Sequence, residues 1–182
     1  NSAGLFSYHA SSAVANTLTV RTPAGDGSGW AGSSHNDWSR TLPAARLAAR
    51  ATAKAIGSRA ATALEPGRYT VLLEPTAVAN LLGLLAFALN GRTADEGRSF
   101  FSRRGGGNRI GDKVVDERVT ILSDPGDPDL LGNPAANDGQ PLGRTVWIEN
   151  GVVKNLAYDR FWADRQGVEP KPFGGGTKLV GT

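Results

Sequence analysis

The chain has 182 residues, of which 40% are hydrophobic and 20% charged, as is usual for a folded globular protein. Twenty basic residues against 17 acidic ones leave a net charge of +3, and no basic run alternates with aromatic residues, so we expect no nucleic-acid partner. The sequence has no cysteine, which excludes disulfides, thiolate zinc ligands and a cysteine nucleophile in this chain, and fits a cytoplasmic protein.

The N-terminal third predicts two strands and a helix. Residues 13–21 alternate apolar and polar side chains with several β-branched residues, which predicts a strand, and residues 28–34 could pair back on it after a glycine-serine turn. Thr41 is a favourable N-cap residue, and Pro43 suits the first turn of a helix. Together with the alanine-rich sequence that follows, these signals predict a helix over 42–56.

The middle of the chain is its most apolar part. Residues 68–73 predict a short buried strand, after which Pro75 begins and Asn90-Gly91 ends a helix that is apolar on nearly all sides. Such a helix belongs in the centre of a protein, and Gly83 in its middle indicates close packing there. Its longest unbroken apolar run has six residues, far fewer than the ~20 of a membrane helix, so we expect no membrane partner.

Two loops in the second half could be taken for a phosphate-binding loop and a calcium-binding loop, but neither has the motif that such a loop requires. The glycine-rich basic segment 99–113 lacks the G-K-[ST] ending of a phosphate loop, so a flexible loop is the better interpretation. The segment 123–129 has three aspartates among prolines, but it lacks the spacing and the distal glutamate of a calcium loop. A turn is the simpler interpretation.

The C-terminal part carries the strongest local signals. Residues 118–122 predict a strand, and residues 144–159 predict a type I′ hairpin around Asn150-Gly151. A short helix over 160–166 follows, and residues 171–182 are expected to form a flexible tail. Strands without βαβ alternation favour an α+β fold, a mostly antiparallel sheet packed with a few helices in a single domain over 1–182.

No active site is evident from the residues alone. A stand-alone peptidase could combine His9, His35 and Asp37, but the two histidines lack the one-turn spacing of a typical zinc site. No G-x-S-x-G elbow is present to indicate a serine nucleophile. The neighbouring carboxylates Asp95 and Glu96 point in different directions and are not expected to share a substrate.

Several motifs recur in an order that is similar to a known family. They are NSAGLFSYHASS at the start, RYTVLLEPTAVANLLGLLAFALNG at 68–91, Ser99-Phe100, Asn137-Asp138-Gly139, RTVWIENGVVK at 144–154, and YDRFW at 158–162. This order resembles the TldD/PmbA family, once called modulators of DNA gyrase and now regarded as peptidases. Members are longer than this chain, which begins without methionine, so we expect a fragment that corresponds to their central and C-terminal parts.

The resemblance also implies a functional assignment. TldD-like subunits carry a zinc-binding H-E-x-x-x-H motif on the apolar helix, and here the histidine, glutamate and second histidine positions of that motif fall on Gly83, Leu84 and Ala88. None of these side chains can bind a metal. The resemblance therefore implies a metal-free, TldE/PmbA-like subunit, with no catalytic or metal residues of its own. It would pair with a TldD-like catalytic subunit, which holds the zinc, to degrade or mature small or unfolded peptides.

The resemblance further implies candidates for a peptide groove or subunit interface. They are Ser99, Phe100, Phe101, Asp138 and Gly139, because they fall in the family's loop motifs. An alternative is a structural or self-assembling binding module that has kept the fold without the enzymatic activity.

Overall fold

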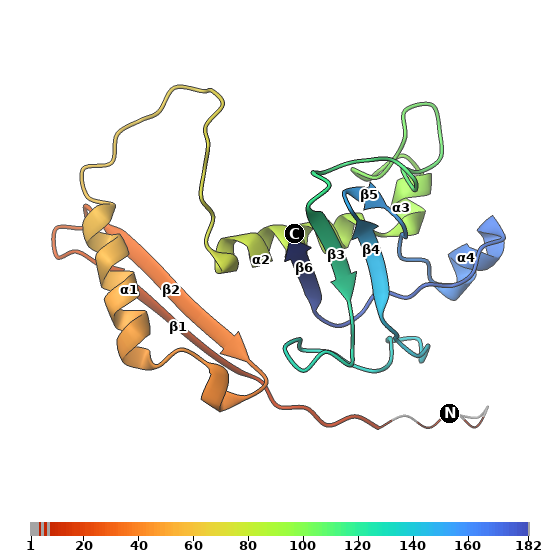
Figure 1. The fold of residues 1–182 in the computed structure, drawn as a ribbon, viewed down its shortest axis with the longest axis horizontal. Coiled ribbons are helices and arrows are strands. Elements are labelled where there is room, and N and C mark those ends of the chain that lie inside the picture. Colours follow the sequence, from red (N-terminus) through yellow and green to blue (C-terminus); the bar gives the residue numbers. More distant parts are fainter. Residues whose placement is uncertain (1–3, 5, 7, 182) are drawn as a thin grey trace. The chain divides into compact units, whose positions relative to one another are not determined.

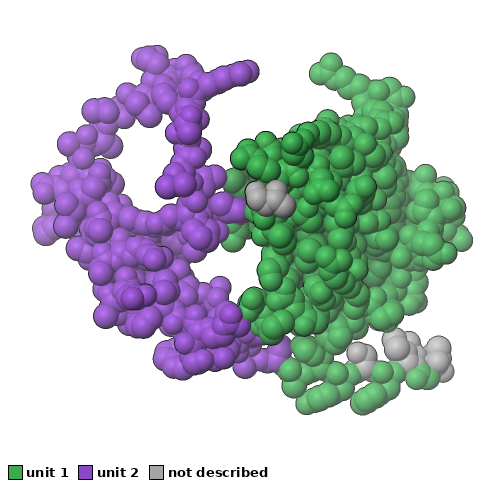
Figure 2. All heavy atoms as spheres, in the orientation of Figure 1, with its two compact units in different colours: residues 1–10, 79–182 green, residues 11–78 purple. Residues whose placement is uncertain are grey.

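The computed structural model describes residues 4, 6 and 8–181 of the chain. The expected single domain divides into two compact units, one of residues 11–78 and the other of residues 1–10 and 79–182 (Figure 2). The N-terminal motif lies partly outside the described residues. The predicted α+β class with antiparallel sheets is confirmed, although the strands form two sheets. No helix within the described residues is long and apolar enough to cross a membrane.

The 11–78 unit is a strand pair covered by a helix (Figure 1). Strands β1 (Val14–Arg21) and β2 (Ser28–His35) form and pair antiparallel, as the sequence predicted. In the register of the structure, Val14 lies opposite His35 and Arg21 opposite Ser28. A short 3-10 helix, η1 (Trp38–Arg40), leads into α1 (Ala44–Gly57).

Helix α1 approaches the strands closely because β2 has glycines at the contact. A Cβ added to Gly29 would lie 2.5 Å from the backbone nitrogen of Ala55, and a Cβ on Gly27 would also meet the α1 backbone. The helix buries Leu47, Ala51 and Ala55 on this side, since small side chains allow the two backbones to come together.

The predicted start of α1 was wrong by two residues. Pro43 is the N-cap residue and makes no side-chain capping bond. The Thr41 hydroxyl instead donates to the Trp38 carbonyl at 2.7 Å, so it closes η1 rather than α1. A favourable capping residue was thus used by the preceding turn of helix.

The predicted buried strand at 68–73 is not formed. These residues belong to no helix or strand, and the side chain of Leu72 is fully exposed. A strand is stabilised by bonds to a neighbour, and no strand of the described residues pairs with this segment. The apolar sequence of residues 68–73 was therefore not sufficient to form a strand.

Helix α2 (Pro75–Ala88) forms where the sequence predicted it, but its burial does not follow the prediction. None of its residues is fully buried, and the exposed fractions of Leu84 and Phe87 are 68% and 83%. A Cβ added to Gly83 would meet nothing within 4 Å, so the inferred close packing there was also wrong.

The second unit contains a four-stranded antiparallel sheet with the order β5-β4-β3-β6. The strands are β3 (Val119–Ser123), β4 (Thr145–Glu149), β5 (Val152–Val153) and β6 (Thr177–Gly181). Asn150 and Gly151 both have positive φ, 49° and 78°, as a type I′ turn requires, which confirms the predicted hairpin. The predicted flexible tail was wrong, because β6 pairs along the whole of β3.

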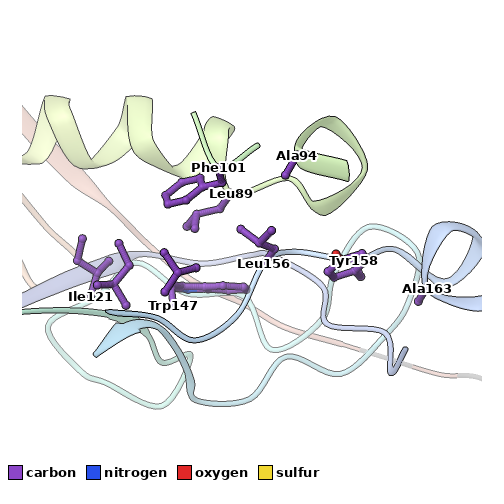
Figure 3. Close-up of a cluster of buried hydrophobic side chains, with 10 residues drawn as sticks. Leu89, Ala94, Phe101, Ile121, Trp147, Leu156, Tyr158 and Ala163 are labelled. Carbon is purple, nitrogen blue, oxygen red and sulfur yellow. The ribbon is translucent and has the colours of Figure 1, made fainter. Parts of the chain in front are cut away.

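The core of this unit lies beside the sheet. Trp147, Phe101 and Leu89 are fully buried, and in Figure 3 the Phe101 and Leu89 side chains extend toward the Trp147 ring. The Trp147 indole N–H donates to the Ser123 hydroxyl at 3.0 Å, so its polar atom is satisfied inside the core. Helix α3 (Gly91–Asp95) was not predicted, whereas α4 (Arg160–Gln166) has the predicted bounds.

Candidate functional site

The C-terminal half of α2 is the position of interest, because the resemblance equates it with a zinc-binding helix. Leu85 and Ala88 pack against the core, whereas Leu84 and Phe87 face outward. Gly83, Leu84 and Ala88 offer no nitrogen, oxygen or sulfur side-chain atom to a metal. Among the described residues, moreover, no group of three or more His, Asp or Glu side chains is gathered for a metal. The side chains at these three positions of α2 therefore do not fit zinc.

Ser99 fastens the loop after α3 to the end of α2. Its hydroxyl donates to the carbonyl of Ala88 at 2.6 Å and accepts from the backbone N–H of Phe101 at 3.2 Å. The last carbonyls of a helix have no partner within the helix, so this bond stabilises the α2 terminus. Ser99 is therefore a positioning residue in this structure.

The two phenylalanines that follow Ser99 have opposite environments. Phe101 is fully buried in the core, so it does not present its ring to a peptide. Phe100 is 58% exposed and meets the Phe101 ring edge-on, with ring centroids 5.2 Å apart. The Arg109 guanidinium lies 5.1 Å from the Phe100 ring centroid, which gives this exposed aromatic a cationic neighbour.

The glycine-rich basic segment 99–113, which we call the basic loop, is held in a defined conformation by hydrogen bonds. Arg103 N donates to Gly107 O at 3.0 Å, and Arg109 N donates to Phe101 O at 2.8 Å. Arg103 also pairs with Asp112 at 2.5 Å. The loop that carries Arg109 is thus tied to the segment that carries Phe100.

A polar cluster that the sequence did not reveal joins α3, the basic loop and α4. Asp95 accepts hydrogen bonds from Asn108 at 2.7 Å, from the Trp162 indole at 2.9 Å and from the Tyr158 hydroxyl at 3.1 Å. Burial, followed by the charge of Asp95, raises the pKa of Tyr158 to about 12. The phenol therefore stays protonated and acts as a donor.

Tyr158 also packs against the chain just after α2. A Cβ added to Gly91 would lie 2.7 Å from the Tyr158 ring, so only glycine fits there without movement. The backbone of Ala157 also makes two hydrogen bonds to the chain just after α2. Ala157 N donates to Leu89 O at 2.8 Å, and Gly91 N donates to Ala157 O at 2.7 Å. The end of α2 is consequently anchored by three separate contacts.

Asp138 and Gly139 lie in a compact turn of the same unit. Asp138 accepts from the Gln140 side chain at 2.6 Å and from its backbone N–H at 3.2 Å. These bonds, that of the Gln140 side chain above all, lower the pKa of Asp138, with a further contribution from the charge of Arg160. Gly139 has a φ of 78°, which allows the tight reversal. Asp138 is exposed and ionised at neutral pH.

The two histidines do not form a recognisable site. His35 Nδ1 accepts from the backbone N–H of Asp37 at 2.8 Å, and Asp37 in turn caps η1 by accepting from Ser39 N at 2.8 Å. The Ser39 hydroxyl and backbone bonds lower the pKa of Asp37. His9 belongs to the other unit, so nothing places it beside His35.

The 11–78 unit contains a groove that no sequence motif indicated. It has a volume of about 780 Å³ and runs between β1 and the segment from η1 to the start of α1. Its lining residues are Ala15, Asn16, Thr17, Leu18, Trp38, Ser39, Thr41, Leu42, Pro43, Ala44 and Leu47. None of these eleven side chains is ionisable, which explains why a search for chemical motifs passed over them.

Comparison with known families agrees with the motif order. The model of the PmbA/TldA metallopeptidase C-terminal domain matches residues 66–177, more than half of the chain. The chain therefore belongs to the TldD/PmbA family. The matched region includes α2, the Ser99 loop and the hairpin.

Individual relatives share the fold at low identity. A proposed modulator of DNA gyrase from Bacteroides thetaiotaomicron has a TM-score of 0.73 at 20% identity, over 92% of this chain and 38% of that one. A second, from Thermotoga maritima, has a TM-score of 0.69 at 23% identity, over 87% and 36% of the two chains. TldE from Thermococcus kodakarensis has a TM-score of 0.62 at 22% identity, over 93% and 39%.

A curated relative is also similar in sequence. An uncharacterized protein of Methanocaldococcus jannaschii is 31% identical over 99 residues, which are 53% of this chain and 23% of that protein. The chain thus covers less than two-fifths of the length of each of these relatives.

Proposed function

We propose that this chain is part of a metal-free subunit of a two-subunit peptidase that degrades or matures small or unfolded peptides. Membership of a metallopeptidase family supports the peptidase assignment. One observation carries the metal-free role: Gly83, Leu84 and Ala88 offer no ligand where a catalytic subunit would bind its metal.

The zinc belongs, in this proposal, to a TldD-like partner subunit. The zinc would polarise the peptide carbonyl and activate water there, while this chain would contribute binding surface. We propose a cytoplasmic location, which the cysteine-free sequence favours.

Phe100 is the best candidate for contact with the peptide or the partner. Its ring is mostly exposed, packs edge-on against the ring of the buried Phe101, and lies beside the cationic Arg109. Aromatic residues, phenylalanine included, and arginine are both enriched in protein interfaces. Ser99 holds the loop in place, and Asp138 with Gly139 supplies a second candidate contact in the same unit.

The test combines this chain, within its full-length protein, with the TldD-like partner and measures cleavage of an unfolded peptide. We expect the two proteins to co-elute, and cleavage to require both. Zinc analysis of the separated subunits should find the metal in the partner. Equal cleavage by the partner alone, or no complex, would show that the proposal is wrong.

A matched pair of variants locates the contact. Phe100→Ala should weaken complex formation or raise the peptide KM by roughly tenfold, the typical loss of an aromatic interface anchor. Phe161→Ala is the control, because Phe161 is similarly exposed and also has an arginine, Arg165, over its ring. Equal effects of the two changes would exclude a specific role for Phe100.

The binding-module alternative is favoured by one feature of α2. Its outward residues Leu81, Leu84 and Phe87 form an exposed apolar stripe, as expected of a surface that assembles with other chains. The molecular mass of the full-length protein in solution distinguishes the two functions. A defined heterodimer supports the peptidase subunit, and a large homo-assembly supports the module.

A further inference from the structure

We infer that the groove between β1 and the η1–α1 segment binds an extended, uncharged peptide segment, which adds as a strand to the free edge of β1. The inference rests on the proposed function in one respect, namely that the protein handles unfolded peptides. It assigns that task to a surface of the 11–78 unit, apart from α2 and the Ser99 loop.

The first argument is the position of the groove along a strand edge. Four consecutive residues of β1, from Ala15 to Leu18, line it. Successive side chains of a strand point to opposite faces, so a groove that touches four in a row runs along the edge. Within the described part of the chain, β1 pairs only with β2, and its other edge has no neighbouring strand. That edge offers backbone donors and acceptors to an extended peptide.

The second argument is that the opposite wall is held in place before any ligand arrives. Asp37 caps η1, and the Thr41 hydroxyl closes it. The backbone N–H of Leu42 donates to the Ser33 hydroxyl at 3.0 Å, which ties the wall to β2. A wall fixed in this way reduces the ordering that binding requires.

The third argument is the chemistry of the surface. Leu47 is buried beneath the groove, Leu18 is partly exposed beside it, and the exposed fraction of Trp38 is 69%. No lining side chain is ionisable, so a charged ligand residue would lose water without gaining a partner. A volume of about 780 Å³ is within the range of ligand-binding clefts. The surface therefore favours uncharged segments with apolar side chains.

The probe for the test is the capped peptide acetyl-Ala-Val-Thr-Val-Ala-amide, titrated into the ¹⁵N-labelled chain. We expect the amide signals of residues 15–18 and 38–44 to shift together, and those of β3 to remain in place. Methylation of alternate peptide nitrogens, and separately replacement of the central threonine by aspartate, should each weaken binding at least roughly tenfold. Shifts elsewhere, or equal binding of the methylated peptide, would overturn the inference.

Two variants complete the test. Trp38→Ala should weaken binding roughly tenfold by removing the exposed aromatic wall. Trp30→Ala is the matched control, because Trp30 is a partly exposed tryptophan of the same unit outside the lining, and it should change affinity by less than about twofold. Equal losses, with the fold of each variant confirmed by its spectrum, would overturn the assignment.

The outcomes separate this inference from the proposed function. If the peptide binds the groove but no partner complex forms, only the subunit proposal fails. If the complex forms and cleaves peptides while the amides of 15–18 do not respond, only the groove inference fails. Shifts of the same amides with protein concentration alone would identify a second copy as the occupant, which also overturns it.

Discussion

Of the two 14-residue helices, α1 is the more polar and yet the more buried, whereas α2 is the more apolar and yet the more exposed. Helix α1 is alanine-rich and carries three basic residues, yet Leu47, Ala51 and Ala55 are almost fully buried. Helix α2 has no charged residue, yet Leu84 and Phe87 are largely exposed. Hydrophobicity therefore does not decide burial in this chain. The presence of a complementary surface does.

The way each helix is held explains the difference. Helix α1 is held along its length, because Leu47 packs in the core of the unit and because Gly27 and Gly29 let the C-terminal half of the helix lie directly on the strands. Helix α2 is held mainly near its C-terminal end, by the core contact of Leu89, by the Ser99 hydroxyl and by the Ala157 backbone. Each of the following predictions tests this contrast.

The largest effect is expected from truncating leucine on the two helices. Leu47→Ala should reduce the stability of the 11–78 unit by about 2–5 kcal/mol, because it leaves a cavity beneath α1. Leu84→Ala should change stability by less than about 0.5 kcal/mol, because its side chain is exposed. Residue-resolved hydrogen exchange measures both, even if the units unfold separately. Similar losses would contradict the contrast.

Alkaline pH should loosen the anchor at the end of α2. The folded-state pKa of Tyr158 is raised to about 12 from a reference of 10.0. The protonated phenol therefore stabilises the folded state fully below about pH 10, and this contribution is lost as the pH rises toward 12. The total is about 2–3 kcal/mol.

Urea unfolding between pH 8 and 11.5 measures this loss. In Tyr158→Phe the corresponding slope should be absent, since the variant has no phenol at position 158. A variant whose stability falls with pH as steeply as that of the parent would show that Tyr158 is not responsible.

Two glycine replacements should have effects of opposite sign. Gly29→Ala should destabilise the α1–β2 contact by about 1–3 kcal/mol, because the new Cβ meets the α1 backbone. Gly83→Ala should stabilise α2 by about 0.5–1 kcal/mol, because nothing lies within 4 Å and alanine favours the helix. Thermal unfolding of the two variants provides the comparison. Destabilisation by Gly83→Ala would indicate that α2 is covered.

The smallest effect is expected at Ser99. Ser99→Ala removes the bond to the Ala88 carbonyl and should cost about 1 kcal/mol, seen as faster amide exchange in the last turn of α2. Ser99→Thr keeps the hydroxyl and is the control. If both variants exchange at the parent's rate, the hydroxyl does not hold the helix end.

Local signals in the sequence were sufficient for elements that need little tertiary context. The Asn150-Gly151 turn was predicted because both residues tolerate positive φ, and the structure has it. Helix α4 was predicted with its bounds, and its Asp159 cap accepts from Trp162 N at 2.7 Å. The motif order likewise indicated the family that the domain model confirms.

The errors share one cause. Residues 68–73 have a strand-like composition but no pairing partner, whereas 177–181 looked like a tail and became β6 because β3 offers an edge. The Asp95 cluster was equally hidden, since its members lie up to 67 residues apart in the chain. Pairing across such separations is not encoded in any short window.

The sequence by itself determined helices α2 and α4, the hairpin, the family and the absence of metal-binding side chains at Gly83, Leu84 and Ala88. These depend on backbone propensity and side-chain chemistry, which each residue carries with it. Only the tertiary structure decided that Phe101 is buried while Phe100 is exposed, and that β1 borders an uncharged groove. Burial and open edges depend on which distant segment lies alongside, and that is a property of the folded chain.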